Sequence, residues 1–218
     1  MTHQIDKLSV VMTVHDAADE LEKNLPLFLT QQWQGALEVI VVDDASTDET
    51  ADVLKRMRAQ YHNLYSTFVP KSVPDPCRHR LTLNVGVKAA HYEWIVVADI
   101  ARPPRTDMAF ERLAEVIALG GIEAVTVYGS NKEGKAPRYH TWTELTEAAP
   151  LLRKAERRPG RRHRGRWFRS WRGMYDAVAV PKELITDTLR YFDHDIHGWK
   201  LAGLRLCVFS KCLFHHSS

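Results

Sequence analysis

The sequence predicts an α/β fold with a doubly wound, mostly parallel sheet that is flanked by helices. Short apolar segments rich in β-branched residues alternate with longer segments whose apolar residues recur at helical spacing. Two short segments, residues 39–42 and 94–98, are continuous apolar runs, as in strands buried on both faces of a parallel sheet. Strands that alternate with helices pair in parallel through right-handed crossovers, which gives the doubly wound arrangement.

Each expected element follows from its local sequence. Residues 18–32 carry apolar side chains at helical spacing, whereas residues 70–76 contain three prolines and are expected to form a loop. In the first half we expect strands at 8–14, 39–42, 65–69 and 93–98, and helices at 18–32, 48–61 and 80–90. In the second half we expect helices at 108–119 and 143–155, and strands at 124–128 and 205–214.

Length and composition restrict the class of protein. A chain of 218 residues that is 44% hydrophobic can bury one sizeable core, so we expect a single domain over residues 1–218. The first residues show neither a signal peptide nor an apolar run long enough for a transmembrane helix. The three cysteines, Cys77, Cys207 and Cys212, lack metal-ligand spacing, which favours reduced thiols and a cytoplasmic location.

Two adjacent acids, Asp43 and Asp44, follow the apolar run at 39–42. In an open α/β sheet the carboxyl ends of the strands form the edge where ligands bind, so these carboxylates are candidates for a binding site. Ser46 and Thr47, followed by Glu49, are typical of a capped helix start. The alternative interpretation is a capped strand-to-helix turn whose two acids are merely solvated.

Four segments together resemble the family 2 glycosyltransferases, which are nucleotide-sugar-dependent enzymes with the GT-A fold. These segments are SVVMTVHDAADELEKNLPLFLTQQW, LEVIVVDDASTDETADVLKRM, LNVGVKAAHYEWIVVADIARPP and FDHDIHGWKLAGLRLCVF, and they occur in the family's order and spacing. The resemblance implies a Rossmann-like nucleotide-sugar-binding half at about residues 1–105. It also implies a smaller acceptor-side half at about residues 106–218.

The resemblance also implies which residues bind the nucleotide. Asp44 would accept a hydrogen bond from the imide N–H of a uracil-like base, and Asp43 would brace the turn or the ribose. His15 could stack on or hydrogen-bond the base, or it could be a surface histidine without a ligand. The other implied nucleotide contacts are Thr13, Val14, Asp16, Arg78, Arg80, Asn84 and Asp99. The arginines among them could instead belong to a solvated helix face.

The sequence departs from the family at Asp99. The family usually has Asp-x-Asp, whose later carboxylate ligates Mg²⁺ or Mn²⁺, but this chain has Asp99-Ile100-Ala101. Alanine offers no side-chain oxygen, which puts a Mg²⁺ or Mn²⁺ cofactor in doubt. Three explanations stay open. Asp99 could hold a metal with His215 or His216, a cationic side chain such as Arg102 could replace the metal, or the protein could bind the donor and transfer slowly or not at all.

Transfer needs a base that takes the proton of the acceptor hydroxyl. By resemblance Asp195 is the candidate, with Trp199 on the same helix face and Asp193 as the second choice. A helix-start carboxylate without a catalytic role is the alternative for Asp195. His215 and His216 follow the last expected strand, where the family often has a histidine near the site.

A strongly basic segment covers residues 153–172, which we call the arginine loop. It contains nine arginines and Lys154 against Glu156 alone, a charge of about +9 in a chain of +3 overall, and it also carries Trp167, Phe168 and Trp171. Such a segment could clamp a diphosphate, attract an anionic acceptor or contact an anionic membrane, or it could be a solvated loop. Nucleic acid would use similar residues but is the less favoured partner.

These observations predict a glycosyltransferase that moves one sugar, with inversion, from a UDP-linked donor to a hydroxyl of a glycan or lipid-linked acceptor. A role in cell-surface polysaccharide synthesis, in the cytoplasm or at the inner face of the membrane, would suit that chemistry. The Gln-x-x-Arg-Trp pattern of the family's processive synthases is absent, which favours single transfers. The alternative is a weak or inactive nucleotide-sugar-binding protein, because Ala101 replaces the usual acid.

Overall fold

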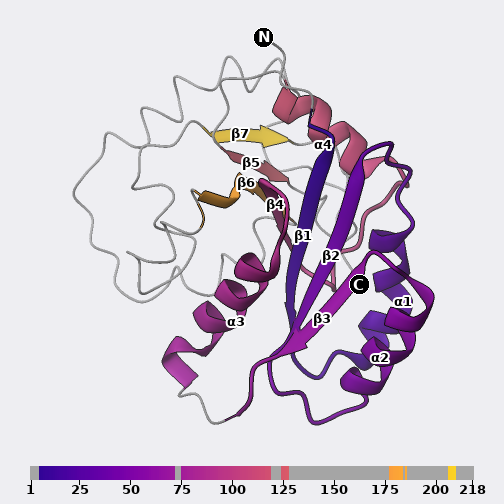
Figure 1. Ribbon diagram of the computed structural model, residues 1–218, viewed down its shortest axis with the longest axis vertical. Coiled ribbons are helices and arrows are strands. Elements are labelled where there is room, and N and C mark those ends of the chain that lie inside the picture. The colour runs from indigo at the N-terminus through magenta and orange to yellow at the C-terminus, as the bar shows by residue number, and fades with distance from the viewer. Residues whose placement is uncertain are drawn as a thin grey trace, which may run out of the picture.

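The computed structural model describes residues 5–71, 75–118, 124–127, 177–183, 185 and 206–209. For residues 75–80, 124, 126–127, 178 and 206–209 it describes the backbone alone. Within this part of the chain a single mixed sheet is flanked by helices (Figure 1). The predicted helix at 143–155 and the arginine loop lie outside the described residues.

The sheet has the strand order β3-β2-β1-β4-β6-β5-β7 in the described part of the chain. Its strands are β1 (Lys7–Val14), β2 (Ala36–Asp43), β3 (Leu64–Phe68), β4 (Trp94–Ala98), β5 (Ala124–Val127), β6 (Ala177–Pro181) and β7 (Leu206–Phe209). The first four strands pair in parallel, as do β5 and β7, whereas β6 runs antiparallel to both β4 and β5. The mostly parallel α/β sheet with flanking helices confirms the predicted fold class.

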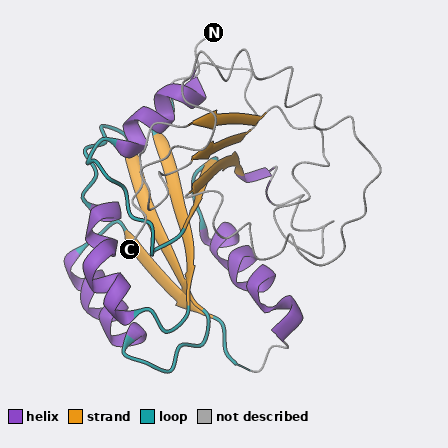
Figure 2. Cartoon of the chain, turned by 180° about the vertical axis from the view of Figure 1, so that it is seen from behind, coloured by secondary structure: helices purple, strands orange, loops and turns teal. Residues whose placement is uncertain are grey.

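The helices cover both faces of this sheet. They are α1 (Ala18–Leu29), α2 (Thr50–Gln60), α3 (Asp75–Ala89) and α4 (Ala109–Ala118). Figure 2 shows α1 and α2 together on one side of the sheet and α3 on the other. None of the helices in the described ranges is long and apolar enough to cross a membrane.

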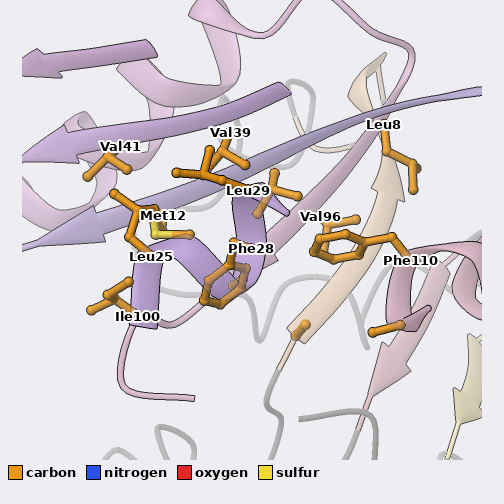
Figure 3. Packing of buried hydrophobic residues seen from close by; sticks show 14 of the residues in the cluster. Leu8, Met12, Leu25, Phe28, Leu29, Val39, Val41, Val96, Ile100 and Phe110 are labelled. Atoms are coloured by element: carbon orange, nitrogen blue, oxygen red, sulfur yellow. The ribbon is translucent and has the colours of Figure 1, made fainter. Parts of the chain in front are cut away.

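Alternating side chains of the central strands build a core on each face. Met12 and Val41 point to the face that α1, α2 and α4 cover, where Phe28 of α1 and Phe110 of α4 meet with their ring centroids 6.4 Å apart (Figure 3). Val11, Ile40 and Val42 belong to the opposite core, under α3. Burial on both faces explains why the sequence of these strands is a continuous apolar run.

Two expectations about the elements are wrong, and one strand was missed. Residues 75 and 76, expected in a loop, begin α3, because proline fits the first turn of a helix, where its missing N–H has no intrahelical acceptor. Helix α2 begins at Thr50 rather than at residue 48. The antiparallel strand β6, with its short sequence AVAVP, was not predicted.

Gly86 lets α3 approach the sheet closely. A Cβ at this position would lie 2.5 Å from Cγ1 of Val11 and 3.0 Å from Cγ2 of Val42, so any side chain would push the helix away from β1 and β2. This close approach keeps α3 against the two strands whose ends form the candidate site described below.

We predict that Gly86→Ala destabilises the protein by about 1–3 kcal/mol through overpacking. Helix propensity alone would predict the opposite sign, since alanine is favoured over glycine by about 1 kcal/mol in a helix interior. Chemical denaturation measures the change, with Lys88→Ala at an exposed position of the same helix as the control. An unchanged or increased free energy of unfolding for Gly86→Ala would contradict the close packing.

Candidate functional site

The carboxyl ends of β1, β2 and β4 lie along the same edge of the sheet because these strands are parallel. Val14 pairs with Asp43, and Val11 pairs with Val97, which brings Asp99 to about the level of Thr13. Adjacent strands are about 4.8 Å apart, so β2 and β4, on either side of β1, are separated by about 10 Å. The acids at the end of β2 and the acid after β4 therefore lie on either side of the end of β1.

Asp43 braces the turn after β2. Its side chain is buried, and its Oδ1 accepts hydrogen bonds from the amide of Ser46 at 2.9 Å and from the Ser46 hydroxyl at 2.6 Å. Its carbonyl oxygen accepts a hydrogen bond from the amide of Val69, at the end of β3. Ala45 between them has a φ of 51°, in the left-handed region that is unfavourable for a residue with a Cβ. The turn is thus held in a strained conformation by a buried carboxylate.

The expected cap of α2 by Ser46 or Thr47 is wrong. Glu49 is the N-cap residue and its side chain makes no cap hydrogen bond. The first-turn amide of Thr50 donates to Asp48 Oδ1 instead, at 3.0 Å. Ser46 and Thr47 do not cap α2, because both form hydrogen bonds with the loop that follows β1.

Reciprocal hydrogen bonds connect the loop after β1 with the loop after β2. Asp16 Oδ1 accepts from the amides of Thr47, at 2.6 Å, and Asp48, at 3.4 Å, while the amide of Asp16 donates to Ser46 Oγ at 2.9 Å. The amide of Ala17 donates to Thr50 Oγ1, and the amide of Ala18 donates to Asp48 Oδ2. We call this set of contacts between residues 16–18 and 46–50 the loop interlock. It fixes the two loops as one unit.

Hydrogen bonds in these two loops favour the charged form of two carboxylates. The hydrogen bond from the Thr47 amide holds the pKa of Asp16 below its ordinary value of 3.8. The hydrogen bond from the Thr50 side chain likewise lowers the pKa of Asp48 below 3.8. Both acids are therefore ionised at neutral pH, which strengthens the hydrogen bonds that they accept.

His15 contacts two aspartates, Asp44 and Asp16. Its Nδ1 is 2.8 Å from the carbonyl oxygen of Asp44, so the tautomer protonated at Nδ1 donates to that carbonyl. Its Nε2 is 3.5 Å from Asp16 Oδ2, and more than half of the His15 side chain is exposed. The amide of Asp44 continues the sheet by donating to the carbonyl of Val14 at 2.8 Å. These contacts hold the His15 ring at the surface beside Asp44.

The turn after β4 carries a negative and a positive side chain. Asp99 Oδ1 accepts from the amide of Ala101 at 3.0 Å, and Asp99 Oδ2 lies 3.9 Å from Nε of Arg102. The carbonyl of Asp99 accepts from the amide of Arg102 at 2.9 Å. Buried Asn24 of α1 donates its Nδ2 to the carbonyl of Ile100, which anchors the turn to the helix. A carboxylate and a guanidinium thus share the end of β4.

The turn after β4 offers a divalent cation one carboxylate, that of Asp99. Ala101 has no side-chain oxygen, and the two oxygens of Asp99 lie beside the Ala101 amide and the Arg102 guanidinium. No group of three or more His, Cys, Asp or Glu side chains suited to a metal occurs in the described ranges. His215 and His216, the other predicted ligands, lie outside these ranges.

Most of the residues that are predicted to contact the nucleotide lie at this edge of the sheet. Val14 is buried and Thr13 is half-buried at the end of β1, while Asn84 is half-buried on α3. Arg78 and Arg80 belong to α3, of which only the backbone is described at these positions. Asp193 and Asp195 lie outside the described residues.

The sequence interpretation missed the bracing role of Asp16, Asp48 and Asn24. The resemblance predicts a nucleotide contact for Asp16, and in the structure its Oδ1 accepts hydrogen bonds from the second loop. The only sequence signal for these contacts is the presence of short polar side chains directly after two parallel strands. Nothing in that pattern tells which loop each side chain will contact.

We predict that Asp16→Ala lowers the melting temperature and speeds amide hydrogen exchange at Thr47 and Asp48, because both amides lose their acceptor. Asp16→Asn retains an acceptor oxygen. In this variant the two amides should exchange at a rate between those in the wild type and in Asp16→Ala. The pKa of Asp16 is lowered in the folded state, so its stabilising effect is present above about pH 3.8 and is lost as the pH falls through the folded-state pKa. A stability difference between wild type and Asp16→Asn that grows below pH 3.8 would contradict this assignment.

Comparisons with known proteins agree with the geometry. The family model "Glycosyl transferase family 2" matches residues 9–172. The "Uncharacterized glycosyltransferase YibD" of Escherichia coli strain K12 is 25% identical over 99 residues, which are 45% of this chain and 27% of that protein. This chain therefore covers about a quarter of that relative.

Solved structures of glycosyltransferases share the fold. The complex of S. aureus TarS 1–349 with UDP-GlcNAc superposes with a TM-score of 0.65 and 17% identity, over 95% of this chain and 57% of that one. The mannosyltransferase PcManGT from Pyrobaculum calidifontis, in complex with GDP-Man and Mn²⁺, gives a TM-score of 0.59 and 19% identity, over 95% of this chain and 55% of that one. At such identities these likenesses establish the fold, which is that of the GT-A glycosyltransferases. Because the family model matches well over half of its residues, the chain belongs to glycosyl transferase family 2.

Proposed function

We propose that the chain transfers a single sugar from a nucleoside-diphosphate sugar, preferably UDP-linked, to a hydroxyl group of a glycan or lipid-linked acceptor. The observation that carries the proposal is the pair Asp43 and Asp44 at the carboxyl end of β2, held by the loop interlock beside the end of β1. Ligands of open α/β sheets bind at this edge. In this proposal residues 1–105 bind the donor and residues 106–218 complete a single domain on the acceptor side.

The two adjacent acids have different environments, which supports different roles. Asp43 is buried and its Oδ1 is used by Ser46, so it holds the shape of the turn. Asp44 is partly exposed at the same turn, with His15 against its carbonyl oxygen. A carboxylate there can accept a hydrogen bond from the imide N–H of uracil, and the His15 ring can cover the base. The UDP-GlcNAc complex of TarS supports a uridine donor, whereas the GDP-Man complex of PcManGT makes a guanosine donor the competing choice.

The proposed reaction is a single in-line displacement. The acceptor hydroxyl oxygen attacks the anomeric carbon, the bond from that carbon to the diphosphate oxygen breaks, and the nucleoside diphosphate leaves. Asp195 takes the proton of the hydroxyl, and the configuration at the anomeric carbon is inverted. The support for Asp195 is its place in the segment FDHDIHGWKLAG.

The proposal for the acceptor rests on the positive charge of the arginine loop. The arginine loop at residues 153–172 concentrates about +9 in twenty residues, with three aromatic side chains among the arginines. Such a segment would attract an anionic acceptor, or the anionic surface of a membrane that carries a lipid-linked acceptor. We therefore place the protein in the cytoplasm, in peripheral contact with the inner face of the membrane, in cell-surface polysaccharide synthesis.

A second candidate function is a nucleotide-sugar-binding protein without transfer. The observation that favours it is the alanine at position 101, where the second acid of the family's motif is absent. The two functions differ in turnover. Intact nucleotide binding with no hydrolysis or transfer, across a panel of UDP- and GDP-sugars assayed with and without Mn²⁺, would select the binding protein.

We predict that Asp44→Asn weakens the binding of UDP about ten- to a hundredfold, because a hydrogen bond to a charged group contributes roughly 1.5–3 kcal/mol. Isothermal titration calorimetry measures the affinity. Asp52→Asn, at an exposed position of α2, is the matched control and should bind UDP as the wild type does. Equal affinities for both variants would remove Asp44 from the nucleotide site.

We predict that Asp195→Asn lowers kcat for sugar transfer by about 10²–10⁴-fold, the usual contribution of a general base, and leaves the affinity for UDP unchanged. Asp193→Asn is the matched control, since Asp193 is the neighbouring candidate. A large loss of kcat in Asp193→Asn with full activity in Asp195→Asn would exchange the two roles. Unchanged kcat in both variants would remove this segment from the chemistry.

A further inference from the structure

The turn after β4 carries more positive than negative charge. It consists of residues 99–105, Asp99-Ile100-Ala101-Arg102-Pro103-Pro104-Arg105, with one carboxylate and two guanidinium groups, and we call it the β4 turn. Its shape is fixed, because Pro103 and Pro104 are buried and Asn24 binds the carbonyl of Ile100. The β4 turn, with both arginines, is therefore held in place at the edge of the sheet.

Arg102 lies beside the single carboxylate of the β4 turn. The Arg102 side chain is only 13% exposed, and its Nε lies 3.9 Å from Asp99 Oδ2. The other oxygen of Asp99 accepts from the Ala101 amide. The single carboxylate thus lies beside a guanidinium, and the β4 turn holds no second carboxylate for a divalent cation.

The β4 turn is also at a suitable distance from the proposed base site. The strand order β2-β1-β4 separates it by two strand spacings, about 10 Å, from the turn that carries Asp44. An extended nucleoside diphosphate covers a comparable span between its base and its phosphates. A nucleotide whose base meets Asp44 and which lies across the end of β1 brings its diphosphate to the β4 turn.

We propose that Arg102, assisted by Arg105, binds the diphosphate of the donor and supplies the positive charge for it, so that donor binding needs no divalent cation. This inference rests on the proposed function. A guanidinium is planar, stays charged at any physiological pH and has five N–H donors, so one arginine can contact a carboxylate and a phosphate together. It also stabilises the charge that develops on the leaving diphosphate during transfer.

The test compares nucleotide binding with and without metal. Isothermal titration calorimetry is run on the full chain with UDP and GDP, first in EDTA and then in Mn²⁺, and the nucleotide that binds more tightly is kept. Its nucleoside, uridine or guanosine, is the probe without phosphates. The proposal predicts equal nucleotide affinity in EDTA and in Mn²⁺. Binding that appears only with Mn²⁺ would overturn the inference and leave the proposed function intact.

Variants of Arg102 test whether the β4 turn binds the diphosphate. Arg102→Ala should weaken nucleoside diphosphate binding at least about tenfold, and nucleoside binding should stay unchanged. Arg102→Lys keeps the charge and should retain part of the affinity. It replaces Arg102→Ala in the test if the alanine variant does not fold. Arg58→Ala, on the exposed side of α2, removes one positive charge elsewhere and should have no effect. A folded Arg102 variant with wild-type affinity for the diphosphate would overturn the proposal.

Ala101→Asp tests the charge balance in the opposite direction. A second carboxylate should weaken binding in EDTA and make it respond to Mn²⁺. Unchanged affinity under both conditions would mean that the β4 turn does not face the diphosphate, and would overturn the inference. If neither UDP nor GDP binds in EDTA or in Mn²⁺, the proposed function itself fails, and the inference fails with it.

Discussion

Asp16 and the backbone amides of the loop after β2 form the interaction on which the candidate site depends. The ends of two parallel strands leave two loops side by side, and the backbone N–H groups of such loops need acceptors. Here each loop supplies acceptors for the other, through Asp16 in one direction and through Ser46, Asp48 and Thr50 in the other. The hydrogen bonds join residues that are about thirty positions apart in the sequence. The site is therefore rigid only when β1 and β2 are correctly paired.

The loop interlock also explains how the turn tolerates strain. Asp16 and Ala45 both have positive φ, with values of 46° and 51°. For a residue with a Cβ this conformation costs about 1–2 kcal/mol. Several hydrogen bonds within and between the loops offset that cost and hold Asp44 at the surface. The strain thus occurs next to Asp44, which is proposed to read the base, where preorganisation favours binding.

The edge of the sheet is electrostatically polar. Asp43 and Asp44 mark one end and the β4 turn, with Arg102 and Arg105, marks the other. A nucleotide has the complementary distribution, since its base donates N–H groups and its diphosphate is anionic. This distribution of charge favours a nucleotide that is bound in one orientation along the strand ends.

Periodicity and apolar runs were enough to predict the first four strands. Burial on both faces leaves a direct trace in the sequences of β1, β2 and β4, whereas β3 is partly exposed. The beginnings of α2 and α3 were wrong, since Ser46 and Thr47 serve a distant loop and Pro76 fits a first helical turn. Strand β6 was missed because its place is set by antiparallel pairing with β4, a tertiary contact without a local signal. The acids at the strand ends were predicted as a binding edge, but the contacts of Asp16 could not be, because they depend on strand order.

A crystal structure of the chain with UDP, grown in EDTA, would test the central claim most directly. The account predicts the base against Asp44, the nucleoside across the end of β1 and the diphosphate against Arg102. A nucleotide bound elsewhere, or bound at this edge with its phosphates directed away from the β4 turn, would contradict it.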